Sequence, residues 1–186
     1  EDPRRQRQMC IRDRSGTTWH AAGLVSQLGP TAAVTKIRKY TLDLYKKLEK
    51  EVDHSAGLRL NGALSIAQTN SRWQELQRQA TTAQLYDVDI DILDSDTIKK
   101  RYPMMHTEDL KGGVLMSGDG AADPSGVTHM LAKAARKGGA KIFEQSPVEK
   151  ILIKNKRVHG VKVNGQIIEC EYIVLATGMW SRQIGE

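Results

Sequence analysis

The chain has 186 residues, of which 39% are hydrophobic and 27% charged, a composition that suits a globular protein of one domain or parts of two. No apolar run approaches the roughly 18–20 residues that a membrane-spanning helix needs, and no secretory signal is visible. The net charge of +6 comes from scattered basic residues without interleaved aromatic residues, which favours a solvated surface over a nucleic-acid-binding one.

The first fourteen residues differ from the rest of the chain. Residues 1–14 hold five arginines and few apolar residues, so their composition predicts a disordered arm. The stretch QMCIRDR also resembles translated adaptor sequence, so a foreign origin is the alternative, and we assign the arm no function. Cys10 and the distant Cys170 lack the spacing of a metal site, which indicates reduced thiols and no metal centre.

The predicted elements begin after a small, glycine-punctuated loop. Residues 15–30 are poor in charge, which predicts a buried or cofactor-facing loop. Apolar residues at three- and four-residue steps predict a helix over 31–52, and a second helix over 70–85 is opened by Asn70 or Ser71. Shorter elements follow the same reasoning: strands over 58–67, 88–93 and 113–116, and a helix between Asp94 and Tyr102.

The next element is a helix with a clear start and end. Asp123-Pro124 combines a capping side chain with a proline in the first turn, and Gly138-Gly139 ends the helix. A strand is predicted directly afterwards over residues 140–144. Helix, double glycine and strand form the second half of a βαβ crossover.

The remaining residues predict a meander and a buried strand. Strands at Val148–Ile153, Val158–Val163 and Gln166–Cys170 are joined by turns, of which Asn164-Gly165 is a strong hairpin signal. The apolar run Tyr172–Ala176 predicts a buried parallel strand that delivers the Thr-Gly loop to a ligand. The fold class is therefore mixed α/β.

Two other groups of polar residues carry no chemistry in this interpretation. Asp119 and Asp123 in DGAADPSG suggest a metal loop, but Asp123 is better explained as a helix cap before proline. Four histidines stand isolated and receive no role: His54, His106, His129 and His159.

Ser15–Leu24, SGTTWHAAGL, carries most of the functional information. Its small residues let the backbone approach a flat ligand closely, and its N–H groups and hydroxyls suit ring nitrogens and carbonyls. His20 has a nucleophilic nitrogen when neutral. On these residues alone, the plainer interpretation is a buried, hydrogen-bonded histidine beside a packed Trp19.

The same run resembles the dimethylglycine dehydrogenase and sarcosine dehydrogenase family, and the resemblance extends from Ser15 to Glu186 through the DGAADPSG and ATGMW motifs. It implies that His20 is joined covalently to the 8α-methyl group of FAD. The residues around His20 would line the flavin: Gly16, Thr17, Thr18, Trp19, Ala21, Ala22, Gly23 and Leu24. Val148 matches a contact on the adenine side and Trp180 a further FAD contact, although an ordinary strand residue and a core aromatic explain them as well.

The resemblance also implies a domain organisation. Residues 15–30 and 119–186 would belong to the FAD-binding domain of a two-domain flavoprotein, and 31–118 to its substrate-side or cap region. The glycine-rich GxGxxG motif of the first Rossmann βαβ unit, which holds the FAD pyrophosphate in this family, is absent from the sequence. We therefore expect the chain to be an internal piece of a longer protein, weakly stable and catalytically silent by itself.

For the intact protein, the resemblance implies FAD-dependent oxidative demethylation of an N-methylated glycine, dimethylglycine or sarcosine. Tetrahydrofolate would take up the one-carbon unit in a C-terminal module, and an electron-transfer flavoprotein or oxygen would accept the electrons. The location would be the mitochondrial matrix in a eukaryote or the cytoplasm in a bacterium. The catalytic residues are left unassigned, and we expect them in the C-terminal part of the family that this sequence lacks.

Two alternatives remain open. The pyruvate dehydrogenase phosphatase regulatory subunit resembles these enzymes without being catalytic, and retention of the complete TWHAAGL run favours an enzyme over it. An amino-acid oxidase of the same broad fold, of the D-amino-acid oxidase type, would hold FAD without a covalent bond.

Overall fold

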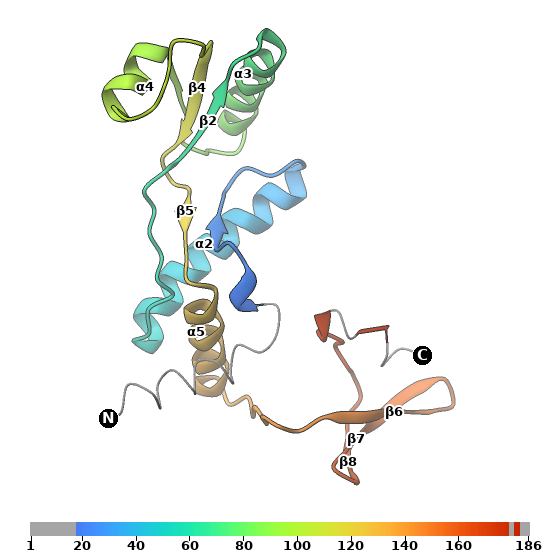
Figure 1. Ribbon diagram of the computed structural model, residues 1–186. Coiled ribbons are helices and arrows are strands. Elements are labelled where there is room, and N and C mark those ends of the chain that lie inside the picture. The colour runs from blue at the N-terminus through green and yellow to red at the C-terminus, as the bar shows by residue number, and fades with distance from the viewer. Residues whose placement is uncertain (1–17, 179–180, 183–186) are drawn as a thin grey trace. The chain divides into compact units, whose positions relative to one another are not determined.

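The computed structural model describes residues 18–178 and 181–182 (Figure 1). The chain divides into two compact units, of which the first runs to Ala140 and the second begins at Lys141. The predicted assignment of segments to FAD-binding and substrate-side regions stays a prediction.

The first unit contains a pair of packed helices, α2 (Ala32–Val52) and α5 (Pro124–Lys137). Val52, Ala56 and Met130 form the buried cluster between them. The backbone at Asp53 turns left-handed and ends α2, so the carbonyls of its last turn need donors from elsewhere. Two lysine ammonium groups of α5 supply them, Lys133 to Asp53 O at 3.1 Å and Lys137 to Glu51 O at 2.6 Å. Both helices agree with the predictions from the sequence.

The first unit also contains a three-stranded antiparallel sheet in the order β2 (Ala63–Ala67), β4 (Gly112–Met116) and β3 (Asp91–Leu93). Adjacent residues of a strand face opposite sides, so Val114 and Leu115 belong to different clusters. Val114 packs with Leu76 of α3 (Asn70–Gln84), and Leu115 packs with Ile98 of α4 (Ser95–Arg101). Helices α3 and α4 thus cover opposite faces of the sheet (Figure 1).

Helix capping in this sheet region matches the sequence at one helix and differs at the other. Of the two candidate caps at the start of α4, Asp94 and Ser95, Asp94 is the cap, because its carboxylate accepts the Thr97 N–H at 2.7 Å. The cap of α3 is Thr69, whose hydroxyl accepts the Arg72 N–H at 3.2 Å, so the assignment to Asn70 or Ser71 was wrong by one or two residues. Threonine and asparagine are both favourable N-cap residues, and the sequence alone does not tell which of them stands at the cap position before the first helical residue.

The second unit is built on a three-stranded antiparallel meander: β6 (Val148–Lys154), β7 (Arg157–Val163) and β8 (Gln166–Glu169). The turns have positive φ at both central residues, 53° and 61° at Asn155-Lys156 and 49° and 76° at Asn164-Gly165. This backbone twist matches that of paired strands, which is why Asn-Gly predicted the hairpin correctly.

Two predicted strands are wrong. Residues 140–144 and 172–176 form no strand, and no strand of the described chain lies hydrogen-bonded beside them. Their apolar side chains are solvent-exposed, 69% for Phe143 and 89% for Val174. The apolar pattern predicted a buried strand at 172–176, and the structure shows neither burial nor pairing there. A strand needs a partner for its backbone groups, which an apolar pattern does not supply.

Candidate functional site

The TWHAAGL segment (residues 18–24) begins with a single 3₁₀ turn, η1 (Thr18–His20), in which Ala21 N–H donates to Thr18 O at 3.1 Å. It ends in the two-residue strand β1 (Leu24–Val25), which pairs antiparallel with β5 (Gly120–Ala121). The segment therefore leads from η1 into β1, and β1 is paired with β5, the strand that precedes α5 (Figure 1).

Gly23 is the tightest point of this segment. Its φ is +71°, in the left-handed region, and its carbonyl accepts the Ala122 N–H at 2.8 Å. A Cβ at this position would lie 2.3 Å from Ala122 O and 3.3 Å from Pro124 Cδ. Only glycine fits this approach, so the sequence requirement is set by the start of α5.

The described side chains of the TWHAAGL segment, which exclude that of Trp19, face outward in this chain. Thr18, His20, Ala21 and Ala22 are exposed, and Leu24 is 81% exposed. A leucine at this exposure contributes little to the core of the unit, and small neighbours leave the backbone accessible. The exposed His20 imidazole and the small residues after it therefore leave room for a flat, partly apolar group such as a flavin ring.

Asp119 and Asp123, considered above for a metal loop, have other partners. The Asp123 carboxylate caps α5, because its two oxygens accept the N–H groups of Ser125 at 3.1 Å and Gly126 at 3.0 Å. Asp119 is 1% exposed, and its Oδ1 accepts the Gln27 N–H at 2.9 Å. Within the described residues, no three side chains of His, Cys, Asp or Glu are grouped to hold a metal ion.

The electrostatics of Asp119 are those of a buried acid. Burial raises the pKa of its carboxyl, while hydrogen bonds from Gln27 and the charge of Arg38 oppose that rise. Sequence reasoning missed the contact between Asp119 and Gln27, because the two residues lie 92 positions apart.

In the second unit, Val148 opens β6 and is 40% exposed. It lines a pocket of about 470 Å³ whose walls are mainly apolar. The lining residues come from the segment before β6 and from the end of the meander that carries the Asn164-Gly165 turn: Phe143, Ser146, Val148, Val161, Val163, Asn164, Gln166 and Ile168. A pocket of this size and character suits an aromatic ring system.

A family model described as FAD dependent oxidoreductase, DAO, matches residues 9–186. The chain belongs to this family. The mixed α/β architecture, the accessible TWHAAGL segment and the apolar pocket are accordingly parts of an FAD-dependent oxidoreductase of this family.

Curated relatives of this FAD-dependent oxidoreductase act on methylated amines by name. The chain is 35% identical over 170 residues to 4-methylaminobutanoate oxidase (formaldehyde-forming) of Paenarthrobacter nicotinovorans, which covers 91% of this chain and 21% of that protein. It is 33% identical over 177 residues to mitochondrial sarcosine dehydrogenase of Homo sapiens, covering 92% of this chain and 19% of that protein. The chain spans about one fifth of the length of these relatives.

A solved relative confirms the fold class. The crystal structure of L-proline dehydrogenase from P. horikoshii matches with a TM-score of 0.83 at 26% identity, over 92% of this chain and 45% of that chain. The predicted mixed α/β fold is therefore confirmed, and the chain corresponds to less than half of such an oxidoreductase.

The predicted FAD-lining residues of this oxidoreductase fall into three groups. Those of the TWHAAGL segment lie together in the first unit, although of Trp19 only the backbone is described. Val148 lies in the second unit. Gly16, Thr17 and Trp180 lie outside the described residues, so their predicted roles stay predictions.

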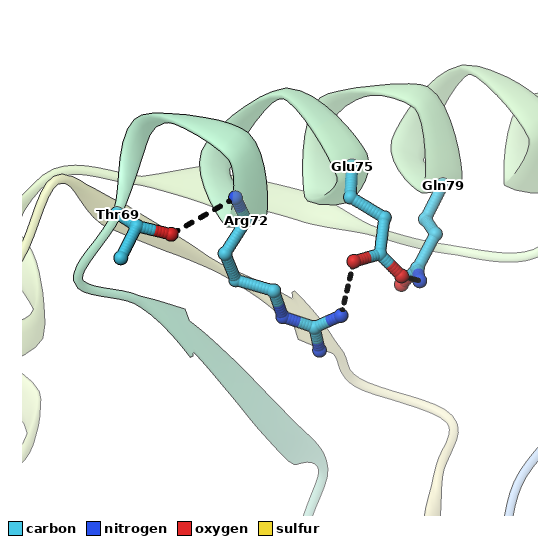
Figure 2. Close-up of polar contacts among 4 residues, drawn as sticks. All are labelled: Thr69, Arg72, Glu75 and Gln79. Atoms are coloured by element: carbon cyan, nitrogen blue, oxygen red, sulfur yellow. Dashed lines mark hydrogen bonds and ion pairs between the residues drawn. The ribbon is translucent and has the colours of Figure 1, made fainter.

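The first unit of the oxidoreductase also has a pocket of about 510 Å³, which sequence reasoning did not predict. It lies between α3 and the loop before α2, with these lining residues: Leu28, Gly29, Pro30, Glu75, Arg78, Gln79, Thr82 and Met116. Glu75 binds Arg72 at 2.8 Å and accepts from Gln79 at 3.1 Å, along one side of α3 (Figure 2). Arg72 holds the pKa of Glu75 below its usual range, so the acid is ionised and internally paired at neutral pH.

None of the described helices is long and apolar enough to span a bilayer.

Proposed function

We propose that the intact protein is an FAD-dependent amine oxidoreductase that demethylates an N-methylated glycine, dimethylglycine or sarcosine, with FAD attached covalently to His20. One observation carries this proposal. The His20 side chain is exposed at the end of a 3₁₀ turn and is followed by small or exposed residues up to Leu24. An accessible imidazole beside accessible backbone is what a covalent flavin attachment requires.

The chain's own residues have separate roles in this proposal. His20 holds the cofactor, and Thr18, Ala21 and Ala22 leave room for the ring against the backbone. Gly23 fixes the direction in which the segment leaves the flavin. Val148 and the apolar pocket of the second unit receive the adenine side. When bound, FAD supplies the acceptor for the hydride equivalent from the carbon–nitrogen bond.

The substrate class rests on what the relatives share. Sarcosine dehydrogenase and 4-methylaminobutanoate oxidase are both named for a methylated amine that also carries a carboxylate, and their backbones of one and three carbons differ in length. The two relatives thus share a methylated amine with a carboxylate, and we propose the same group on a glycine backbone for this protein. We further propose tetrahydrofolate as carbon acceptor, electron-transfer flavoprotein or oxygen as electron acceptor, and a matrix or bacterial cytoplasmic location.

The test uses the intact protein. After acid precipitation, a yellow pellet and a flavin mass on the tryptic peptide that contains His20 are expected. His20→Ala is expected to abolish this mass, whereas the control His106→Ala, another exposed histidine of the first unit, leaves it unchanged. Oxidation of dimethylglycine, sarcosine and 4-methylaminobutanoate is then compared by formaldehyde release.

Each other outcome replaces the proposal with one of the alternatives. FAD released intact by acid, with activity on amino acids, means a noncovalent amino-acid oxidase. A protein that binds no flavin in any form means a regulatory subunit. Covalent flavin with turnover of 4-methylaminobutanoate alone keeps the attachment and overturns the glycine backbone.

A further inference from the structure

The segment that follows the TWHAAGL segment has little regular structure of its own. Strand β1 pairs with β5 through only two residue pairs, Leu24 with Ala121 and Val25 with Gly120. A pairing this short specifies its register weakly, and a slip by one residue would move the strand by about 3.3 Å and turn its side chains to the opposite face. Something else must fix the register of residues 25–29.

Asp119 supplies the first fixed point. Its Oδ1 accepts the Gln27 N–H at 2.9 Å, two residues beyond the paired strand. Asp119 is itself fixed through its backbone, which accepts the Gly62 N–H at 2.9 Å and donates to Met116 O at 3.2 Å. Residues 25–29 are thus tied to a turn that is held by two other segments of the first unit.

Helix α2 supplies the second fixed point. The Arg38 guanidinium donates to Ser26 Oγ at 3.0 Å and to Leu28 O at 2.6 Å, on either side of Gln27. At the end of the segment, the Gly29 N–H donates to the hydroxyl of the buried Thr35 at 3.0 Å. Of the groups around Asp119, Arg38 is also the one whose charge favours the ionised carboxylate.

The Asp119 carboxyl is costly to keep where it is. The side chain is 1% exposed, and its Oδ2 has no hydrogen-bond partner among the described residues. A buried polar oxygen without a partner destabilises a fold, so a neutral apolar residue would serve packing better. Buried polar groups of this kind are best known for fixing register, which is the role that the Gln27 contact indicates.

We propose that Asp119 is a positioning residue that sets the register of residues 25–29 and thereby holds the flavin-bearing His20 peptide in place. The proposal rests on the proposed function for the flavin itself. Loss of the Asp119–Gln27 hydrogen bond removes the fixed point of residues 25–29 that lies nearest the two-residue pairing between β1 and β5, and His20 lies only four residues before that strand. The environment of the flavin should change with it.

The experiment compares Asp119→Ala and Asp119→Asn in the intact protein purified with its flavin. Two quantities are measured: hydrogen exchange at the Gln27 amide, and the visible absorption spectrum and midpoint potential of the flavin. Asp119→Ala should speed Gln27 exchange about tenfold or more and should shift the spectrum and potential. Asp119→Asn keeps an Oδ1 acceptor and should restore both.

Asp109→Ala is the matched control, because this exposed aspartate binds the Gln68 side chain at 2.6 Å and should change neither quantity. If Asp119→Ala fails to fold, Asp119→Ser, whose shorter side chain does not reach Gln27, makes the same comparison. Unchanged Gln27 exchange overturns the proposal, and so does faster exchange with an unchanged flavin. A wild-type protein without flavin overturns the proposed function, and Gln27 exchange then decides the anchoring by itself.

Discussion

Gly23 and Ala122 lie 99 positions apart in the sequence and touch through their backbones, with the Ala122 N–H donating to Gly23 O at 2.8 Å. The same contact leaves no room for a side chain, because a Cβ at Gly23 would lie 2.3 Å from Ala122 O. The segment that carries His20 and the start of α5 are therefore one local structure, and each constrains the other.

Gly23→Ala should consequently disturb both stability and flavin attachment. The left-handed φ alone costs an alanine roughly 1–2 kcal/mol, and the clash with a fixed carbonyl adds to it. We expect the free energy of unfolding, measured in urea, to fall by more than about 2 kcal/mol. Flavin on the His20 peptide should fall with it.

Gly139→Ala separates these two causes. Gly139 also has a positive φ, +91°, but nothing lies within 4 Å of its added Cβ. The Gly139→Ala variant should therefore lose only about 1 kcal/mol of unfolding free energy and should keep its flavin. Equal losses for Gly23→Ala and Gly139→Ala would mean that the close approach to Ala122 has no energetic weight.

The Asp123 cap should carry much of the stability of α5. Asp123→Ala removes the acceptor for the Ser125 and Gly126 N–H groups, and we expect a loss of about 1–2 kcal/mol in urea denaturation. Asp123→Asn should recover most of it, because asparagine caps as well as aspartate. A loss that asparagine does not recover would assign the effect to the negative charge at the helix start instead.

The helices and the meander were predictable because their signals are local. The helix over 31–52 follows from apolar spacing, the start of α5 from Asp123-Pro124, and the hairpin from Asn164-Gly165. Each of these motifs contains its own hydrogen-bond partners within a few residues. The helix boundaries consequently agree with the sequence to within one or two residues.

What the sequence did not predict depends on partners far along the chain. Residues 172–176 have the composition of a strand but no paired neighbour among the described residues. Asp119 was considered only beside Asp123, because nothing near it indicates the Gln27 amide 92 positions away. Resemblance drew attention to His20, whereas only the fold explains why Gly23 must be glycine.

The core under α3 gives a direct test of the sheet packing. Leu76 is fully buried with Ala67, Ala80 and Val114, so Leu76→Ala should cost about 2–5 kcal/mol of unfolding free energy. Leu85, directly after the same helix, is 76% exposed and serves as the control. Leu85→Ala should change stability by less than about 0.5 kcal/mol. Similar losses at both positions would contradict the packing of α3 on β2 and β4.

The pH dependence of stability should reveal the buried carboxyl of Asp119. Burial raises its pKa above the ordinary value of 3.8, so the folded protein binds this proton more tightly than the unfolded chain does. The stability that the protonated Asp119 contributes is fully present below the pKa it has in the unfolded chain. That stability is lost as the pH rises through its raised pKa in the folded protein. Asp119→Asn cannot ionise, so its stability relative to the wild type should grow between pH 4 and pH 7.

Urea denaturation of both proteins at several pH values measures this difference, because all other titrating groups are common to them. Asp109→Asn, which removes an exposed carboxylate, corrects for the loss of one surface charge. A constant difference between Asp119→Asn and wild type across this range would mean that the carboxyl is ionised in the fold without cost. The unpartnered Oδ2 would then have to be satisfied by a donor, and the charge of Arg38 would outweigh burial in setting the pKa of Asp119.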